Sequence, residues 1–317
     1  MPFKENTFFT EKKMNRYQKL LVIIIAMAVA AFVLFSSWLD SRVVFGQMPK
    51  PGKLVKPSVS VKKPESNKSD SSVFAKAALS NSKLKTSLEW AFGKKRQTGW
   101  YLYIPLIQHT IKTESRPEET EFAGALSEWQ KEHALSANGI LDEETLLAMI
   151  KFWQSRRIPK LYEADETTLF HAPIADFFDP TRDANLLYLE KETYAAYKKM
   201  ITAAAKDLNL QIENGTLTGD EKFLTIISAH RSRAYQEQLR KKEPNAGRAQ
   251  LAFTSPHFTG RALDIYVGGE PVTTKDENRA VQVETEVYKW LVKNAERFGF
   301  YNYFYEPWHW EYVPENK

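Results

Sequence analysis

The chain has 317 residues, of which 43% are hydrophobic and 26% are charged, so it can bury a sizeable core in about two domains plus extra segments. The formal net charge is +5, but much of the excess lies in one lysine-rich segment, so the charge does not indicate a nucleic-acid partner. Cysteine is absent, which excludes disulfides, thiolate metal sites and cysteine nucleophiles. Any bound metal must therefore use nitrogen and oxygen ligands.

A long apolar run near the N-terminus predicts a membrane-spanning helix. Residues 20–39 contain no charged side chain, and this length is enough to cross a bilayer. Ala26, Ala28 and Ala30 lie inside the run and Trp38 lies at its end, which favours an uncleaved signal anchor over a cleaved signal peptide. Four basic residues, Lys12, Lys13, Arg16 and Lys19, lie directly before the run, against Arg42 alone directly after it. This bias predicts a cytoplasmic tail at 1–19 and an extracytoplasmic remainder.

The next segment predicts a tether. Residues 46–72 contain four Pro and six Lys, with two acidic residues and no aromatic residue. Such a composition cannot form a core, so we expect a solvated linker across 40–82.

A small all-α domain is predicted at 83–155. Phe122, Leu126 and Trp129 recur at helical spacing, and Asp142 precedes a second periodic helix. The run F-A-G-A-L-S-E-W-Q-K-E-H-A-L-S-A-N-G-I-L-D-E-E-T-L resembles the second half of the small peptidoglycan-binding domain. This resemblance implies contact with the cell wall, whereas the periodicity by itself indicates only the helices.

A connector is predicted at 156–184, and a second domain at 185–317. We expect a helix at 191–208 and a buried strand at 223–227. Further strands are expected at 262–267, 300–305 and 309–313, with one long helix at 278–298 ended by Gly299. The predicted class is therefore α+β, a short antiparallel sheet with helices packed against it.

Two separated motifs near the C-terminus carry the chemistry. The first, Ser255-Pro-His-Phe-Thr-Gly-Arg-Ala-Leu-Asp264, contains His257 and Asp264, and the second, Glu306-Pro-Trp-His309, contains Glu306 and His309. Two imidazoles and one carboxylate form a suitable ligand set for Zn²⁺, and a nearby free carboxylate can act as a general base. Taken alone, a histidine of this kind is usually a structural or surface residue, and an aspartate before a strand is usually a cap or turn residue.

Together, the two motifs resemble those of the zinc D-Ala-D-Ala peptidases of the VanX/VanY type. The resemblance covers about residues 185–315 and implies the fold that these peptidases share with the Hedgehog signalling domain. It also implies that His257, Asp264 and His309 bind zinc and that Glu306 is the catalytic base.

The segment from Ser228 to Gln236 resembles a third motif of that family, S-G-Y-R-S-x-x-x-Q. The resemblance implies that Arg231 stabilises the oxyanion and that Gln236 and Ser255 lie near the substrate. This chain departs from the pattern at Ala229 and at His230, which replaces a tyrosine. We expect His230 to be a packing residue rather than a third imidazole ligand.

The implied activity is a zinc-dependent D-alanyl-D-alanine carboxypeptidase that removes terminal D-Ala from peptidoglycan stem peptides. The expected location is the outer side of a bacterial cell membrane, with one membrane-spanning helix and the cell wall as partner. Two alternatives remain: an endopeptidase that cuts within the stem or cross-bridge, and a non-catalytic scaffold that binds the wall.

Overall fold

The computed structural model describes residues 68–242 and 254–314. They belong to one compact unit, whereas the other unit, Met1–Lys63, lies outside the described residues. The predicted tail at 1–19, the predicted membrane helix at 20–39 and most of the predicted linker therefore also lie outside them. Within the described ranges, no helix has both the length and the apolar composition needed to cross a bilayer.

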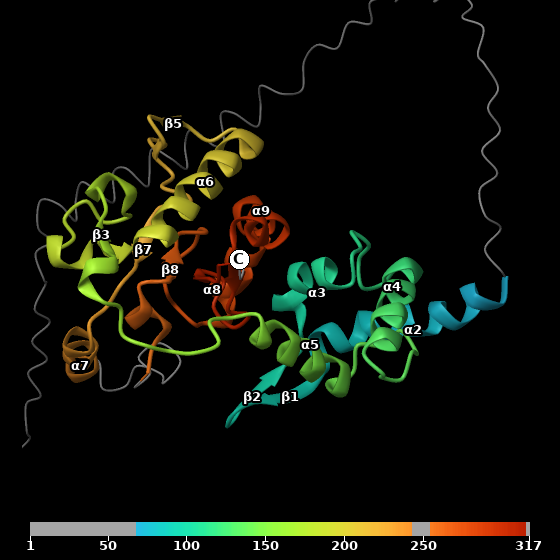
Figure 1. Ribbon diagram of the computed structural model, residues 1–317. Helices are drawn as coiled ribbons and strands as arrows, with labels where there is room; N and C mark the ends of the chain where they lie inside the picture. The colour runs from blue at the N-terminus through green and yellow to red at the C-terminus, as the bar shows by residue number, and fades with distance from the viewer. Residues whose placement is uncertain (1–67, 243–253, 315–317) are drawn as a thin grey trace, which may run out of the picture. The chain divides into compact units, whose positions relative to one another are not determined.

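The first described region is mostly helical and carries one β-hairpin (blue to green in Figure 1). Its elements are α2 (Lys68–Ser87), β1 (Glu89–Phe92), β2 (Lys95–Thr98), η1 (Tyr101–Tyr103), α3 (Ile104–Thr110), α4 (Thr120–Glu132) and α5 (Glu143–Ser155). We call residues 68–155 the helical unit. The prediction of an all-α domain was wrong here, because Gly93 adopts a positive φ of 60° and lets β1 turn back onto β2.

Helix α2 corrects the predicted linker, because its first fifteen residues (68–82) lie in the segment expected to be extended. Ala77, Ala78 and Asn81 of this helix are buried. The Asn81 side chain donates to the Gly139 carbonyl at 2.8 Å and accepts from the Leu141 amide at 2.8 Å. These hydrogen bonds fix α2 to the loop between α4 and α5, although few of its residues are apolar.

The predicted helices of this unit are confirmed. Phe122, Leu126 and Trp129 of α4 are buried, as the helical spacing indicated. Asp142 is the N-cap of α5, and its carboxylate accepts from the Thr145 amide at 2.9 Å.

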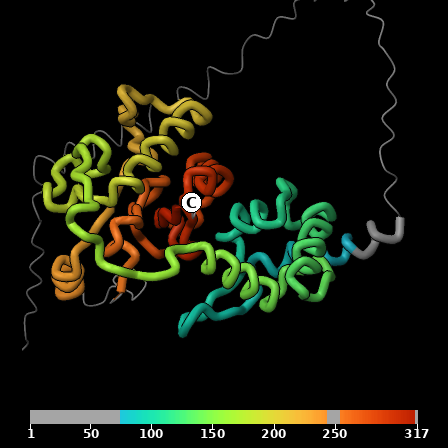
Figure 2. Tube along the Cα trace, in the orientation of Figure 1, coloured from blue at the N-terminus to red at the C-terminus, as the bar shows by residue number. Residues whose placement is uncertain are grey.

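The chain then leaves α5 and runs through short elements toward the second region, as the green trace in Figure 2 shows. These elements are η2 (Glu166–Thr168), β3 (Leu169–His171), η3 (Ile174–Asp176), η4 (Ala184–Leu186) and β4 (Tyr188–Glu190). Strands β3 and β4 pair antiparallel, with Phe170 opposite Leu189.

A four-stranded antiparallel sheet forms the centre of the second region. Its strands are β7 (Ile226–Ser228), β8 (Ala262–Ile265), β9 (Phe300–Asn302) and β10 (His309–Tyr312). Their order across the sheet is β7-β8-β10-β9, so the last strand of the chain lies beside β8. Asp264 therefore has Ser228 as its partner on one side and His309 on the other.

Helices and a small hairpin accompany this sheet. They are α6 (Lys191–Leu208), β5 (Ile212–Glu213), β6 (Thr216–Leu217), α7 (Arg233–Lys242), η5 (Pro256–Thr259), α8 (Asp276–Glu284), α9 (Glu286–Asn294) and η6 (Ala295–Phe298). The prediction for α6 is confirmed, but the single helix expected at 278–298 is divided. Thr285 adopts an extended conformation with ψ of 145° and caps α9, because its side-chain oxygen accepts from the Tyr288 amide at 3.1 Å.

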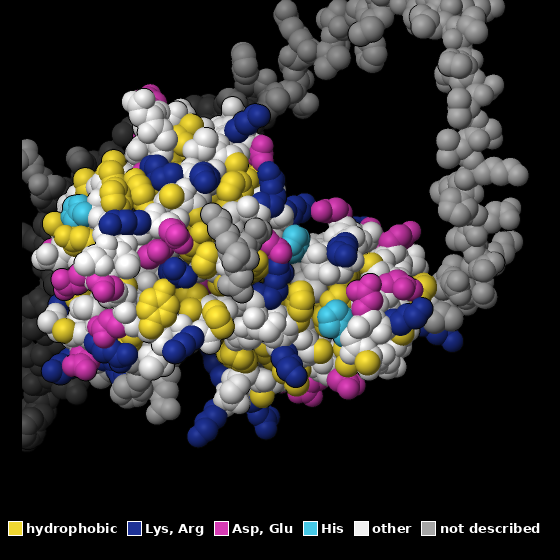
Figure 3. Space-filling view, viewed as in Figure 1, with side chains coloured by type: hydrophobic (Ala, Val, Ile, Leu, Met, Phe, Trp, Pro, Cys, Tyr) yellow, Lys and Arg dark blue, Asp and Glu magenta, His cyan; other side chains and the backbone are white. Residues whose placement is uncertain are grey.

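The α+β class is confirmed, and the buried hydrophobic side chains of the two regions form one continuous cluster. Burying one large apolar side chain contributes about 1.5–3 kcal/mol, so a shared cluster joins the regions strongly. On the face shown in Figure 3, basic and acidic side chains are intermixed rather than gathered by sign.

Candidate metal centre and active site

His257 is placed by a short turn whose ends are fixed by the sequence. Ser255 caps η5 by accepting from the His257 amide at 3.3 Å, and Gly260 ends it with a positive φ of 70°. The His257 Nδ1 lies 2.7 Å from the Ala229 carbonyl oxygen, which can only accept, so Nδ1 carries the hydrogen. The lone pair of Nε2 is therefore directed toward Asp264, whose Oδ1 lies 3.3 Å away.

His309 reaches the same carboxylate across the sheet. It lies opposite Asp264 in the β8–β10 register, and its Nδ1 is 2.9 Å from Asp264 Oδ1. Its Nε2 lies 3.1 Å from Glu311 Oε1 and donates to it. One nitrogen of each imidazole thus faces Asp264, while the other is held by an acceptor.

These three side chains form a group that fits a metal ion. One ligand atom from each of His257, Asp264 and His309 lies within 4.8 Å of the others, and all three residues are buried. Arg231 Nη2 donates to Asp264 Oδ2 at 3.1 Å, which leaves Oδ1 as the oxygen that faces both imidazoles. Two imidazoles and a carboxylate with a fixed outer hydrogen bond on each are a donor set typical of zinc sites in enzymes.

The charges around the group agree with a ligand role. Burial lowers the pKa of His257, and Arg231 adds to this effect, so its imidazole is neutral. Burial acts to raise the pKa of Asp264, but His257, His309 and Arg231 hold that pKa well below its usual range. Burial likewise acts to lower the pKa of His309, but hydrogen bonds to Asp264 and Glu311 outweigh it and raise the pKa. A metal ion would have to displace the proton on His309.

Glu306 lies in the turn between β9 and β10 and belongs to no ion pair within the described residues. It is 5% exposed, and its Oε1 has no hydrogen-bond partner among them. Burial raises the pKa of Glu306 to about 7, although His309 opposes the shift. A buried carboxylate with a free oxygen and a pKa near neutrality is suited to proton transfer.

Glu306 and Asp264 line one pocket of about 270 Å³, together with Arg231. The remaining lining residues are Arg182, Ile227, Ser228, Tyr235, Leu239, Val272 and Trp308. The structure thus brings together the metal group, the candidate base and the candidate oxyanion residue. It does not place Ser255 or Gln236 among the described lining residues.

The roles of those two residues in the structure are supporting ones. Ser255 caps the turn that carries His257. Gln236 is buried on α7 and accepts from Arg231 Nη1 at 3.3 Å. His230 lies outside the metal group, and its main-chain amide donates to the Tyr188 carbonyl at 2.9 Å.

Arg182 is the most informative lining residue that the sequence reasoning missed. Its guanidinium group donates to the carbonyls of Ile227 at 2.8 Å and Leu186 at 3.2 Å. These bonds hold a second cation in the same pocket as Arg231. No motif contains Arg182, because it lies in the connector, and only the fold brings it to the pocket. Of the C-terminal aromatic residues, Trp308 lines the pocket, while Trp310 is buried and packs against Tyr288.

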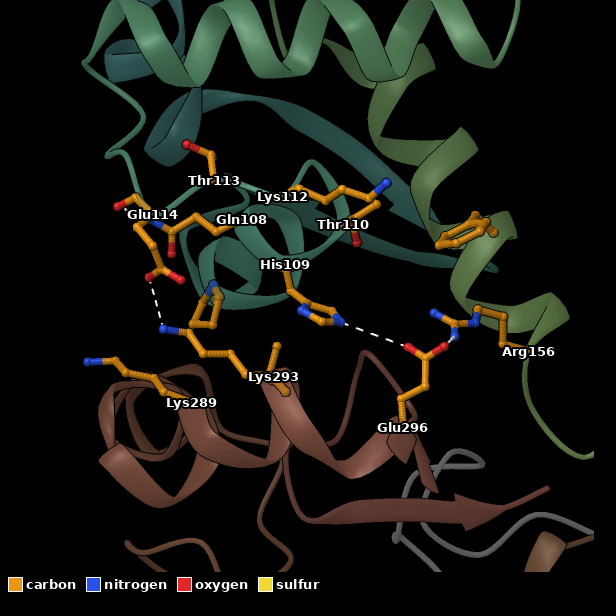
Figure 4. A pocket seen from close by; sticks show the side chains of 13 residues that line it. Gln108, His109, Thr110, Lys112, Thr113, Glu114, Arg156, Lys289, Lys293 and Glu296 are labelled. Atoms are coloured by element: carbon orange, nitrogen blue, oxygen red, sulfur yellow. Dashed lines mark hydrogen bonds and ion pairs between the residues drawn. The ribbon is translucent and has the colours of Figure 1, made fainter. Parts of the chain in front are cut away.

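A larger hollow of about 750 Å³ lies elsewhere, between the helical unit and the helices α9 and η6. Figure 4 shows charged side chains that approach one another across it. Lys293 pairs with Glu114 at 2.9 Å, and Glu296 pairs with Arg156. The hollow is therefore bridged by its own ion pairs, and none of the metal-group residues lines it.

One known family matches the part of the chain that carries this site. Residues 186–315 match the family model VanY, described as D-alanyl-D-alanine carboxypeptidase. The matched segment contains the three metal-group residues, Glu306 and Arg231, but neither the helical unit nor Arg182. A search of curated proteins gave no significant match.

Proposed function

We propose that this protein is a zinc-dependent D,D-carboxypeptidase that removes the terminal D-Ala of peptidoglycan stem peptides. The observation that carries the proposal is a pocket lined by both Glu306, whose Oε1 is free, and Asp264, the carboxylate that His257 and His309 share. The family match over 186–315 supports the same class of reaction.

The three metal-group residues would hold the zinc ion through His257 Nε2, Asp264 Oδ1 and His309 Nδ1. Bound there, zinc would supply Lewis acidity toward the scissile carbonyl and the attacking water. Glu306 takes a proton from that water and later delivers it to the amine of the departing D-Ala. Its raised pKa suits both steps, because one group must accept and then release the proton.

Arg231 has two tasks in this proposal. Its Nη2 holds Asp264 Oδ2 at 3.1 Å, which keeps the carboxylate oriented. Its remaining N–H groups stabilise the negative charge that develops on the carbonyl oxygen. The loss of such an interaction typically lowers the rate by about 10²–10³.

The pair of arginines favours a carboxypeptidase over an endopeptidase. Arg182 adds a second fixed cation to the pocket, and the substrate of a carboxypeptidase ends in a free carboxylate at this point. An arginine fork matches the two oxygens of a carboxylate, so Arg182 is suited to bind the terminal group. An endopeptidase substrate would present a neutral amide there instead.

The proposal also includes a location. The apolar run at 20–39 would anchor the protein in a bacterial cell membrane with the peptidase outside, and the resemblance to peptidoglycan-binding domains supports wall contact by the helical unit.

The test is product analysis with the full-length protein on a muropeptide that carries a pentapeptide stem, with bound zinc measured on the same sample. Release of free D-Ala by zinc-loaded protein is the expected result. Cleavage inside the stem or cross-bridge would instead identify an endopeptidase. Bound zinc without any cleavage would contradict both the carboxypeptidase and the endopeptidase, and would favour a non-catalytic scaffold.

A further inference from the structure

The segment that carries Glu306 and His309 is packed against the helical unit as well as against its own sheet. The Phe304 ring lies close to three aromatic rings of that unit, with centroid distances of 4.9 Å to Phe92, 5.5 Å to Tyr103 and 6.0 Å to Trp153. Next to it, the Tyr305 hydroxyl accepts from Lys95 Nζ at 2.5 Å. The turn that presents the candidate base thus rests on residues far upstream.

A more specific connection reaches the metal group itself. Glu311, two residues after His309 on β10, is 1% exposed and accepts from His309 Nε2 at 3.1 Å. The same oxygen, Oε1, accepts from Arg157 Nε at 3.0 Å and from Arg157 Nη2. The other oxygen accepts from the Ile158 amide at 3.0 Å. Both oxygens of the carboxylate therefore accept hydrogen bonds, and most of the donors belong to Arg157 and Ile158, directly after α5.

Arg157 is itself held in place from two sides. Its Nη1 donates to Gln154 Oε1 at 2.7 Å, and its guanidinium group lies 4.1 Å from the centre of the Tyr303 ring. The pair is mostly buried, with side-chain exposures of 20% for Arg157 and 1% for Glu311. Several hydrogen bonds and burial hold this pair in a single arrangement, unlike the exposed ion pairs across the larger hollow.

We propose that Arg157 and Glu311 are positioning residues of the metal site, which make the segment directly after α5 part of the support of that site. Arg157 fixes the Glu311 carboxylate, and Glu311 fixes the ring orientation and the tautomer of His309, so that Nδ1 faces Asp264. Acceptors that hold a ligand histidine in this way commonly change metal affinity about 10- to 100-fold when they are removed. Arg157 lies outside the segment matched by the family model, so the matched segment lacks one of the residues that position His309.

This inference rests on the proposed zinc site, and its test measures zinc affinity directly. Full-length wild type, Arg157→Gln and Glu311→Gln are titrated with zinc against a chromophoric chelator. Both variants should bind zinc about 10- to 100-fold more weakly than wild type. The matched control is Arg156→Gln, because Arg156 is the neighbouring arginine and forms an ion pair with Glu296 that touches no metal-group residue. Its zinc affinity should equal that of wild type.

A second readout separates positioning from general damage. With Co²⁺ in place of zinc, the visible absorption bands report ligand geometry, and they should shift in Arg157→Gln and Glu311→Gln but not in Arg156→Gln. Arg157→Lys keeps the charge without the planar fork and should recover only part of the affinity. If Arg157→Gln does not fold, Arg157→Lys and Glu311→Gln carry the test. Wild-type zinc affinity in the folded variants would overturn the inference, whereas a wild type that binds no zinc would instead overturn the proposed function.

Discussion

His309 and Asp264 lie directly opposite each other on the paired strands β10 and β8, with Nδ1 and Oδ1 2.9 Å apart. The register of the sheet, rather than a loop, thus fixes two of the three metal-group residues. Because sheet register is resistant to slippage when side chains on the strands are buried, the distance between these ligand atoms is stable. The third residue, His257, depends instead on the turn that ends at Gly260.

The Gly260 turn gives the first prediction. Gly260 has φ of 70°, and a Cβ atom there would lie 3.0 Å from the Glu190 amide nitrogen and from Leu169 Cδ2. Gly260→Ala should therefore lower the free energy of unfolding by about 1–2 kcal/mol or more, and should weaken zinc binding by moving His257. Gly219→Ala is the control, because a Cβ atom there meets nothing within 4 Å. Chemical denaturation of both variants measures the difference, and equal stabilities would contradict the expected strain.

Arg182 gives a prediction about substrate choice. If Arg182 binds the terminal carboxylate, Arg182→Gln should lower kcat/KM on a pentapeptide-stem substrate by about 10- to 100-fold, as expected for a lost hydrogen bond between charged groups. On the same substrate with a C-terminal amide, wild type and variant should react equally slowly. Arg233→Gln is the control, because this exposed arginine pairs with Glu163 and does not line the pocket. An equal loss on the acid and the amide would show that Arg182 only supports the fold.

His109 predicts a pH dependence of stability. Burial lowers the pKa of His109 from its ordinary value of 6.5, Arg156 and Lys293 add to this, and Glu296 and Glu114 oppose it. As the pH falls, His109 is therefore protonated at a higher pH in the unfolded chain than in the folded chain. Protonation favours the unfolded chain, so the contribution of His109 to stability decreases below about pH 6.5.

The comparison that isolates this contribution uses His109→Asn, which cannot titrate. Between about pH 7 and pH 5, wild type should lose more of its unfolding free energy than this variant. Parallel curves for wild type and His109→Asn would contradict the prediction.

The parts of the site that the sequence predicted are those with short-range or motif signals. His257 and Asp264 are seven residues apart across a turn and a strand, so their proximity follows from local structure. His309, Glu306 and Arg231 were assigned through family resemblance. The structure places Glu306 and Arg231 in the lining of one pocket with Asp264, and His309 lies against Asp264. Gly299 was predicted from the local sequence to end a helix, and it does end η6, with φ of 81°.

The parts that the sequence did not predict depend on contacts between distant segments. Arg157 and Glu311 are 154 residues apart, and neither residue has a local pattern that indicates its partner. Arg182 becomes a pocket residue only because the connector crosses the end of β7. Helix α2 was missed for a related reason, since its attachment relies on the polar side chain of Asn81 rather than on an apolar stripe.

The measurement that tests the central claim most directly compares wild type with Glu306→Gln in the full-length protein. Both are assayed for release of D-Ala from a pentapeptide-stem muropeptide, and bound zinc is quantified in each. Glu306 is expected to transfer the proton without holding the metal, so the variant should keep its zinc while kcat/KM falls by about 10²–10⁴. A variant with unchanged zinc and unchanged turnover would contradict the assignment of Glu306 as the catalytic base.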